Sequence, residues 1–281
     1  GAYHTCAVLD DGSVKCWGFG GDGRLGSGGT AHLGNGAGEM GDDLPVVDLG
    51  AGRTAVSVTA GGDHTCAVLD DGSVKCWGYG GDGRLGSGGT ENLGDDGGEM
   101  GDALSVVDLG AGRTAVSVTA GAHHTCAVLD DWSVKCWGDG GDGRLGSGGT
   151  ADLGDGAEEM GDALSVVDLG TGRTAVSVTA ASTAHTCAVL DDGSVKCWGY
   201  GRDGRLGSGD TEHLGDGAGE MGDALPVVDL GTDRTAVSVT AGAHHTCALL
   251  DDGSVKCWGN GGFGRLGSGD TEHLGDGAGE M

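Results

Sequence analysis

Residues His4–Gly18 read HTCAVLDDGSVKCWG, and closely matching stretches start at His64, His124, His185 and His245. Each half is rich in Val, Cys, Thr and Trp, and Asp-Asp-Gly lies between the halves, which is typical of two strands and a turn. A three-residue loop needs a left-handed residue at its third place, where Gly12 stands. We therefore expect a β-hairpin in each of the five copies.

The three-residue loop also sets which residues lie opposite one another. Val8 should face Val14 and Cys6 should face Cys16, with all four side chains on one face of the hairpin. Paired cysteines at constant spacing indicate local disulfides, which persist in oxidising compartments, so a secreted or cell-surface location is expected. A structural zinc site is disfavoured, because four ligands are needed and each copy offers two cysteines and one nearby histidine. The expected disulfides join Cys6 with Cys16, Cys66 with Cys76, Cys126 with Cys136, Cys187 with Cys197, and Cys247 with Cys257.

The hairpins return about every 60 residues, the mark of a tandem repeat architecture. After each one come a glycine-rich loop, an acidic stretch, an apolar run such as LPVVDL (residues 44–49) and TAVSVTA (residues 54–60). The apolar run and the alternation predict two more strands, with Val56 and Val58 on one face. Four strands per repeat and no helical pattern are typical of a β-propeller blade; a β-solenoid, with shorter coils, is the structural alternative.

The predicted fold is thus an all-β, five-repeat propeller of four-stranded blades, forming one domain over residues 1–281. The chain holds five hairpins but four copies of each other strand. Three arrangements follow: a closed ring with incomplete terminal blades, a part of a larger propeller, or a chain whose exposed strand edges borrow strands from a neighbour.

Composition excludes several classes of protein. A chain of 281 residues with 66 glycines, 6 Trp, 3 Tyr and 2 Phe does not have the composition of a helix-rich enzyme core. The formal charge of −28 disfavours binding to nucleic acid and to anionic membranes. No apolar run reaches about 18 residues, so membrane insertion is not expected.

The hairpin sequence and the GRLGSG segment that follows it resemble the regulator of chromosome condensation repeat family, over all five copies. The resemblance implies a propeller, which in that family usually has seven blades. This chain departs from the family in having five copies, added cysteine pairs, and arginine where glutamine is usual. The acidic, cysteine-bearing form resembles secreted bacterial members of the family. The arginines are Arg24, Arg84, Arg144, Arg205 and Arg265.

Repetition argues against catalysis. An enzyme site is a single asymmetric constellation, whereas His4 and its four equivalents occupy one position in every repeat, as expected of scaffold residues. His123 and His244 are additional and are expected at the surface, in turns. The GFGGDG segment (residues 18–23) matches G-x-G-x-x-G, yet no helix follows to bind a phosphate. We expect no enzyme activity and no required cofactor.

The acidic loop of the second repeat is a candidate calcium site. Asp95, Asp96, Glu99 and Asp102 lie close together among glycines, and Ca²⁺ prefers flexible, oxygen-rich loops. A solvated acidic loop is the favoured interpretation, because no EF-hand spacing is present.

Variation between copies indicates where a partner binds, since loops on a stiff scaffold commonly carry binding sites. The repeated tryptophan is expected to pack between blades. Trp132 replaces a turn glycine, so we expect either an altered turn or an exposed contact site. The preferred function is a secreted, non-enzymatic scaffold that binds a protein or other extracellular partner; the alternative is a structural protein that self-associates head to tail into fibres or a surface layer. The predicted partner surface comprises Phe19, Tyr79, Trp132, Asp139, Tyr200 and Asn260.

Overall fold

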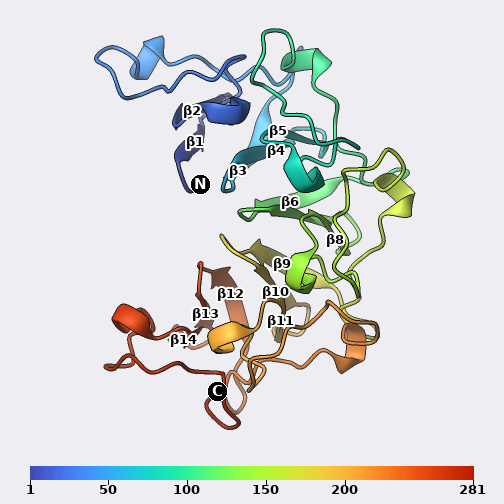
Figure 1. Cartoon of the computed structure of the whole chain (residues 1–281), viewed down its shortest axis with the longest axis vertical. Coiled ribbons are helices and arrows are strands. Elements are labelled where there is room, and N and C mark those ends of the chain that lie inside the picture. Colours follow the sequence, from blue (N-terminus) through green and yellow to red (C-terminus); the bar gives the residue numbers. More distant parts are fainter.

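The computed structural model describes residues 1–281. Five small antiparallel sheets follow one another in chain order around an arc, which is open between the first and the fifth sheet (Figure 1). No sheet closes on itself, and the described elements are strands and short 3₁₀ turns. No helix of the structure has the length and the apolar character needed to cross a membrane.

All five hairpins form in the predicted register. Cys6 pairs with Cys16 and Val8 with Val14, and the other copies repeat this pairing. Gly12 has a φ of +78°, and its N–H donates to the Leu9 carbonyl at 3.0 Å. The hairpin strands are β1 (His4–Val8), β2 (Val14–Gly18), β4 (His64–Leu69), β5 (Val74–Gly78), β7 (His124–Leu129), β8 (Val134–Gly138), β10 (His185–Leu190), β11 (Val195–Gly199), β13 (His245–Leu250) and β14 (Val255–Gly259).

The register brings the two cysteines of each hairpin together, and all five predicted disulfides form. In every copy the two Cα atoms lie 4.1 Å apart, and no cysteine is left free. The prediction of five local disulfides is therefore confirmed. The bonds join Cys6 with Cys16, Cys66 with Cys76, Cys126 with Cys136, Cys187 with Cys197, and Cys247 with Cys257.

The TAVSVTA segments form the third strand of the second to fifth sheets and pair with the hairpin that follows them. The first sheet has two strands, β1 and β2. Blades are numbered one to five by their hairpins below. The added strands are β3 (Ala55–Ala60), β6 (Ala115–Ala120), β9 (Ala175–Ala180) and β12 (Ala236–Ala241).

The predicted alternation within this strand is wrong at its start. The pairing of β3 with β4 shifts between Ala55 and Ser57, so the residue between them bulges out of the ladder. Val56 is 66% exposed, whereas Ala55 and Val58 pack in the core. A bulge adds one residue to a strand and so reverses the faces on either side of it, which a period of two does not anticipate.

The predicted fourth strand is also not present as a strand. Residues 44–49 form no strand, and their backbone bonds the sheet only through Val47 N–H and the Val14 carbonyl, at 2.8 Å. Side chains hold the segment in place instead. Leu44 and Leu49 are buried, and the Lys75 side chain of the next blade donates a hydrogen bond to the Leu49 carbonyl at 3.0 Å. Blades two to five are therefore three-stranded, and an apolar strap runs along the outer edge of blades one to four.

Short 3₁₀ turns shape both loops that follow the hairpin. In the glycine-rich loop, Gly80 lies against another segment so closely that an added Cβ would collide with the Glu91 carbonyl. Glycine is therefore required there for close packing of two backbones. The turns of the glycine-rich loops are η1 (Gly21–Gly23), η3 (Gly81–Gly83), η5 (Gly141–Gly143), η7 (Arg202–Gly204) and η9 (Gly262–Gly264); those of the acidic loops are η2 (Gly41–Asp43), η4 (Gly101–Ala103), η6 (Gly161–Ala163) and η8 (Gly222–Ala224).

The apolar core is divided among the contacts between neighbouring blades. In the cluster between blades two and three, the disulfide Cys66–Cys76 with Val68 packs against Leu129 and Trp137 of the next blade. Four such clusters join the five blades, and in each of them a fully buried tryptophan comes from the later blade. The prediction that tryptophan packs between blades is confirmed at these contacts.

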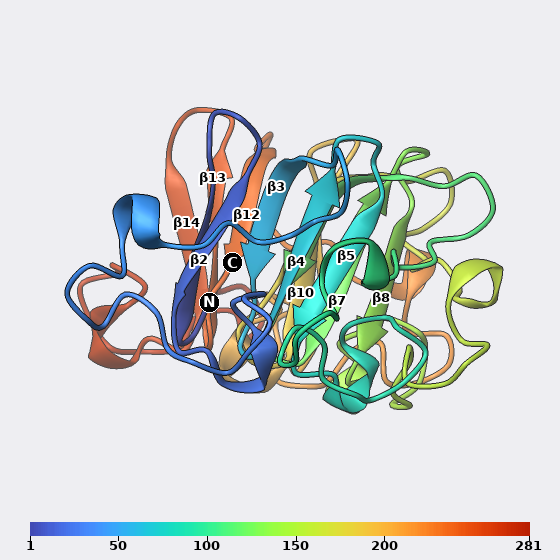
Figure 2. The same cartoon turned by 90° about the horizontal axis from the view of Figure 1, so that it is seen from above.

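The outward face of the first blade is not covered by another blade. Trp17 is only half-buried and Thr5 is exposed, although the equivalent residues of later blades are fully buried. Figure 2 shows the blades side by side from above. The hairpin turns lie along one rim, and the 3₁₀ turns of the glycine-rich loops lie along the other.

The outward face of the last blade is likewise open. Val255 in blade five is 65% exposed, whereas Val74 of blade two is 0% exposed. The disulfides show the same contrast: Cys197 of blade four is 2% exposed and packs against blade five, whereas Cys257 of blade five is only half-buried. The two ends of the arc therefore expose apolar surface that the inner blades bury.

Candidate functional site

Three positions that differ between repeats lie together on one rim of the propeller, which we call the variable rim. It is built by three residues of each repeat: one before the hairpin, one directly after it, and one in the following loop, as in Tyr3, Phe19 and His32. Phe19 N–H donates to the Tyr3 carbonyl at 2.9 Å, and the rings of Phe19 and His32 are 4.6 Å apart. In the other repeats the variable rim comprises Asp63, Tyr79 and Asn92; His123, Asp139 and Asp152; Ala184, Tyr200 and His213; and His244, Asn260 and His273.

The same backbone contacts hold the variable rim in every repeat. The third rim residue accepts the N–H of the glycine that follows the second rim residue, as Asn92 Oδ1 does from Gly80 at 3.1 Å and Asp152 Oδ1 from Gly140 at 2.9 Å. His, Asn and Asp all offer an acceptor at this place, so the residue type varies while the loop keeps its shape.

A buried arginine lies beneath each central residue of the variable rim in the first four blades. The guanidinium of Arg84 lies 4.8 Å from the centre of the Tyr79 ring, a cation–π distance, whereas Arg144 instead pairs with Asp139 at 2.8 Å. Tyr79 is 39% exposed, so it covers the arginine and still faces solvent. These arginines thus position the variable side chains.

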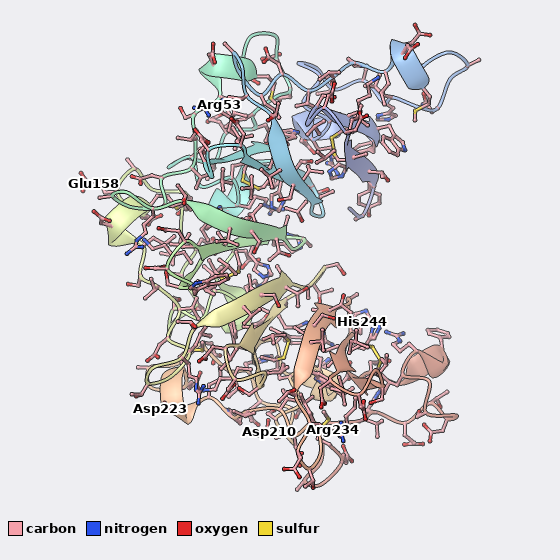
Figure 3. The ribbon with its side chains drawn as sticks, turned by 180° about the vertical axis from the view of Figure 1, so that it is seen from behind. Arg53, Glu158, Asp210, Asp223, Arg234 and His244 are labelled. Carbon is pink, nitrogen blue, oxygen red and sulfur yellow. A yellow bond between two sulfur atoms is a disulfide. The ribbon has the colours of Figure 1, made fainter.

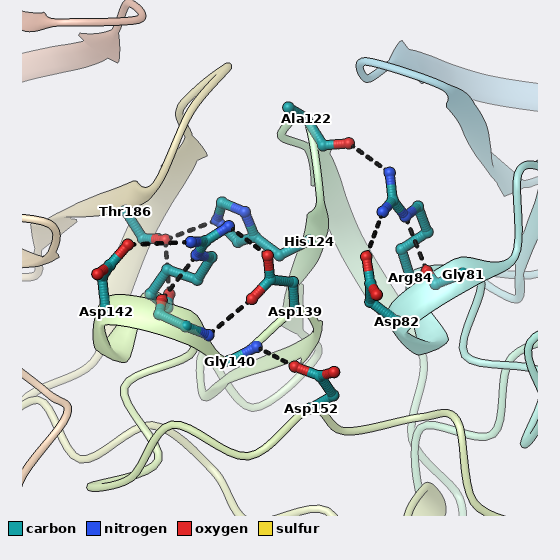
Figure 4. Close-up of polar contacts among 12 residues, drawn as sticks. Gly81, Asp82, Arg84, Ala122, His124, Asp139, Gly140, Asp142, Asp152 and Thr186 are labelled. Atoms are coloured by element: carbon teal, nitrogen blue, oxygen red, sulfur yellow. Dashed lines mark hydrogen bonds and ion pairs between the residues drawn. The ribbon is translucent and has the colours of Figure 1, made fainter.

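Each arginine of these four blades is tied to an aspartate in the preceding 3₁₀ turn. Asp82 has a left-handed φ of +60°, and its carboxylate bonds Arg84 at 2.5 Å. Asp82 also lies next to His123 and Asp139 of blade three, and one ligand atom from each of the three lies within 4.8 Å of the others. Figure 4 shows Asp82 and Asp139 with their partners.

Sequence reasoning missed the Asp82, His123 and Asp139 group. Aspartate stands at the Asp82 position in four of the five copies, so variation does not mark it. His123 was expected only as a surface turn residue, and it is half-buried.

The outer edge of the molecule is also charged; Arg53, Glu158 and Asp223 lie along it in Figure 3.

The repeated histidines link neighbouring blades. Thr125 Oγ1 donates to the Arg84 carbonyl at 2.9 Å, so its oxygen accepts the Nε2 hydrogen of His64 at 2.8 Å, which leaves Nδ1 unprotonated. Burial lowers the pKa of His64 well below its ordinary value, and lowers the pKa of His185 to about 3. A neutral, hydrogen-bonded histidine in each interface stabilises the scaffold.

The candidate calcium residues do not come together as one group of four. Glu99 Oε2 accepts the N–H groups of Gly94 and Asp96, whereas Asp102 Oδ1 accepts the N–H of Ala51 from the preceding repeat. Burial and the nearby Glu99 raise the pKa of Asp95. Calcium binding at these residues stays a prediction.

Trp132 lies on the opposite rim from the other predicted partner residues. It has a φ of +65°, and its N–H still donates to the Leu129 carbonyl at 2.9 Å, as the glycine does in the other turns. The turn is therefore unaltered, and the indole is 47% exposed. The expected altered turn is therefore wrong; the side chain is exposed as expected, and its role as a contact site stays a prediction.

Comparison with known proteins supports the repeat assignment. The sequence matches the regulator of chromosome condensation (RCC1) repeat over residues 1–24, 55–84, 115–144, 176–205 and 236–265. It is 32% identical to the ultraviolet-B receptor UVR8 of Arabidopsis thaliana over 98% of this chain and 55% of that protein. It is 31% identical to the human E3 ubiquitin-protein ligase HERC2 over 95% of this chain and 5% of that protein. The chain thus spans about half the length of the plant relative.

Solved structures show the same fold. Human WBSCR16 superposes with a TM-score of 0.68 at 21% identity, covering 97% of this chain and 63% of that one. Yeast RCC1 (Prp20), solved bound to Kap60, superposes with a TM-score of 0.64 at 18% identity, covering 92% and 54%. The repeat matches, the blade register and these superpositions agree, and the chain belongs to the regulator of chromosome condensation (RCC1) repeat family.

Proposed function

We propose that this chain is a secreted, non-enzymatic propeller scaffold that binds a protein partner through its variable rim. The observation that carries the proposal is the concentration of variation at the variable rim: the buried apolar residues between blades are nearly identical in every repeat, whereas the three rim positions differ in charge, size and aromaticity. A scaffold that is constant inside and varied along one rim presents a specific surface.

Three further observations support this proposal. Aromatic residues are enriched at protein interfaces, and Phe19, Tyr79 and Tyr200 on the rim are each supported by an arginine, which limits the side-chain freedom lost on binding. Yeast RCC1 is a family member solved with a protein partner, Kap60. The five disulfides fit an oxidising, extracellular setting.

The test compares two variants as immobilised baits for extracellular proteins. Tyr79→Asp combined with Tyr200→Asp changes the rim to the residue that blade three already carries, so the blades should still fold. Trp132→Gly changes the opposite rim to the residue of the other four copies. We expect the double variant to capture at least about tenfold less of a partner protein that both the parent and Trp132→Gly capture. Equal recovery on all three baits, or loss only with Trp132→Gly, would contradict the proposal.

A second candidate function is head-to-tail self-association, favoured by the residues at the two ends of the arc. Within the chain, the middle residue of the 3₁₀ turn in a glycine-rich loop lies next to the first two rim residues of the next blade, as Asp82 does with His123 and Asp139. The residues left without such neighbours are Phe263 of blade five and Tyr3 and Phe19 of blade one, all aromatic. Phe263 is 100% exposed. We infer that a second copy of this chain docks blade one against blade five.

Light scattering coupled to size exclusion tests this association over a range of protein concentrations. We expect the mass to rise with concentration, and Phe263→Asp, which restores the residue of the other four repeats, to give a monomer. Tyr79→Asp combined with Tyr200→Asp should leave the association unchanged, which separates the two functions. A parent protein that remains monomeric at all concentrations would contradict this candidate.

A further inference from the structure

Asp82, His123 and Asp139 form a group with the chemistry of a metal site at the interface of blades two and three. All three are half-buried, and each contributes one ligand atom within 4.8 Å of the other two. Asp82 comes from η3, His123 precedes β7 and Asp139 follows β8, so three segments held by different backbone contacts position the group. The group is distinct from the acidic loop that contains Asp95.

The carboxylates are oriented by hydrogen bonds outside the group. Arg84 Nη2 bonds Asp82 Oδ2 at 2.5 Å, and Arg144 Nη1 bonds Asp139 Oδ2 at 2.8 Å (Figure 4). Gly141 N–H donates to Asp139 Oδ1 at 2.7 Å. Carboxylates that bind metals are commonly held by such outer hydrogen bonds, which fix their direction. The two guanidinium groups also repel a cation, so the two carboxylates must offset that charge.

The histidine is available as a neutral ligand. Burial, followed by the charges of Arg84 and Arg144, lowers the pKa of His123, while Asp139 and Asp82 oppose that shift. An unprotonated imidazole at neutral pH offers a lone pair, and imidazole with carboxylates suits Zn²⁺ and similar ions. The net charge of −28 raises the local concentration of cations around the protein.

We propose that Asp82, His123 and Asp139 bind one divalent transition-metal ion, for which Zn²⁺ is the best fit, with water at the remaining positions. Zinc at about 2.1 Å from each ligand requires ligand atoms about 3.4 Å apart in a tetrahedron. The three ligand atoms lie within 4.8 Å of one another, so they must move closer together when the metal binds. Bound metal would join blade two to blade three, because Asp82 belongs to one and the other two ligands to the next.

The equivalent interfaces of the same chain provide natural comparisons. Between blades four and five the group is Asp203, His244 and Asn260, and the Asn260 amide donates to Asp203 Oδ2 at 3.1 Å. An amide nitrogen there is a donor and not a ligand. Between blades one and two the group lacks histidine, because Asp63 stands at that position and pairs with Arg24 at 2.6 Å. Between blades three and four the two rim positions hold alanine and tyrosine. Only the second interface therefore has both carboxylates and the imidazole.

The experiment titrates the chelator-treated, disulfide-intact chain with Zn²⁺ by calorimetry and repeats the titration with Co²⁺, whose absorption reports imidazole and carboxylate ligation. We expect one site per chain, with affinity reduced at least about tenfold in His123→Ala and in Asp139→Asn, the latter copying the Asn260 interface. His244→Ala should bind like the parent. Asn260→Asp should raise the stoichiometry to two, because it completes the equivalent group.

Three results would overturn the proposal: no saturable site in the parent, unchanged affinity in both His123→Ala and Asp139→Asn, or equal loss in His244→Ala. A stoichiometry of one in Asn260→Asp would contradict the claim that the two carboxylates and the imidazole suffice. Circular dichroism and thiol titration of each metal-free variant show that the blades and disulfides are intact, so lost binding is not lost folding.

Discussion

A single threonine in each later blade joins that blade to the one before it. Thr125 accepts a hydrogen bond from His64 and donates one to the Arg84 carbonyl, which also accepts the Trp137 indole N–H at 3.1 Å. All these groups are buried, so a missing partner leaves a polar group without a hydrogen bond. The same residue type in blade one, Thr5, is exposed.

We predict that Thr125→Val lowers the free energy of unfolding by about 1–3 kcal/mol, because the His64 N–H loses its acceptor in a site closed to water. Urea unfolding measures the effect. Thr5→Val is the matched control and should change stability by less than about 0.5 kcal/mol. Equal effects of the two substitutions would show that the contact between blades does not depend on this hydrogen-bond chain.

The buried histidines make stability depend on pH. Burial lowers the pKa of His4 to about 4 and of His185 to about 3, so the folded protein binds fewer protons than the unfolded chain once the pH is below 6.5, the ordinary value. Stability should therefore be complete above pH 6.5 and fall as the pH falls towards 3, by up to about 1.4 kcal/mol per pH unit for each buried histidine. Urea midpoints at pH 7.5, 6.0 and 4.5 measure this, and equal midpoints would contradict it.

At the scale of elements, the hairpin was predictable because its information is local. The turn glycine, the spacing of the cysteines and the period of two together set the register of Cys6 with Cys16, and the structure has that register. The strap at residues 44–49 was not predictable in this way, because an apolar run does not show whether its backbone will pair. The bulge beside Val56 is likewise a consequence of pairing with β4.

The turn that contains Trp132 gives a prediction of its own. A left-handed backbone conformation destabilises a residue with a Cβ by about 1–2 kcal/mol. The Trp132 indole is half-exposed, so its burial offsets little of this cost. Trp132→Gly should therefore stabilise the protein by about 1 kcal/mol in urea unfolding. Gly72→Ala, at the same place in blade two, should destabilise it, because its Cβ would lie 2.7 Å from Thr114 Cβ. A large loss of stability in Trp132→Gly would mean that the indole packs against the blades.

At the scale of the whole molecule, the open arc follows from the way the repeats pack. One face of each hairpin packs on the next blade and the opposite face on the blade before, so a chain of such blades always has two unlike ends. The sequence indicated five repeats and unequal strand counts, but not which blade lacked a strand. The proximity of Asp82 to His123 and Asp139 could not be predicted from the sequence either, because residues of successive repeats meet only when the blades stack.

The variable rim is the part of the molecule on which the proposed function depends. Hydrogen–deuterium exchange of the chain, alone and bound to the partner recovered on the parent bait, tests it most directly. We predict slower exchange on binding in peptides covering residues 17–24, 77–84 and 198–205, and no change in peptides covering the hairpin turns, including residues 129–134. Protection confined to the hairpin turns, or to the outward faces of blades one and five, would contradict a binding surface on the variable rim.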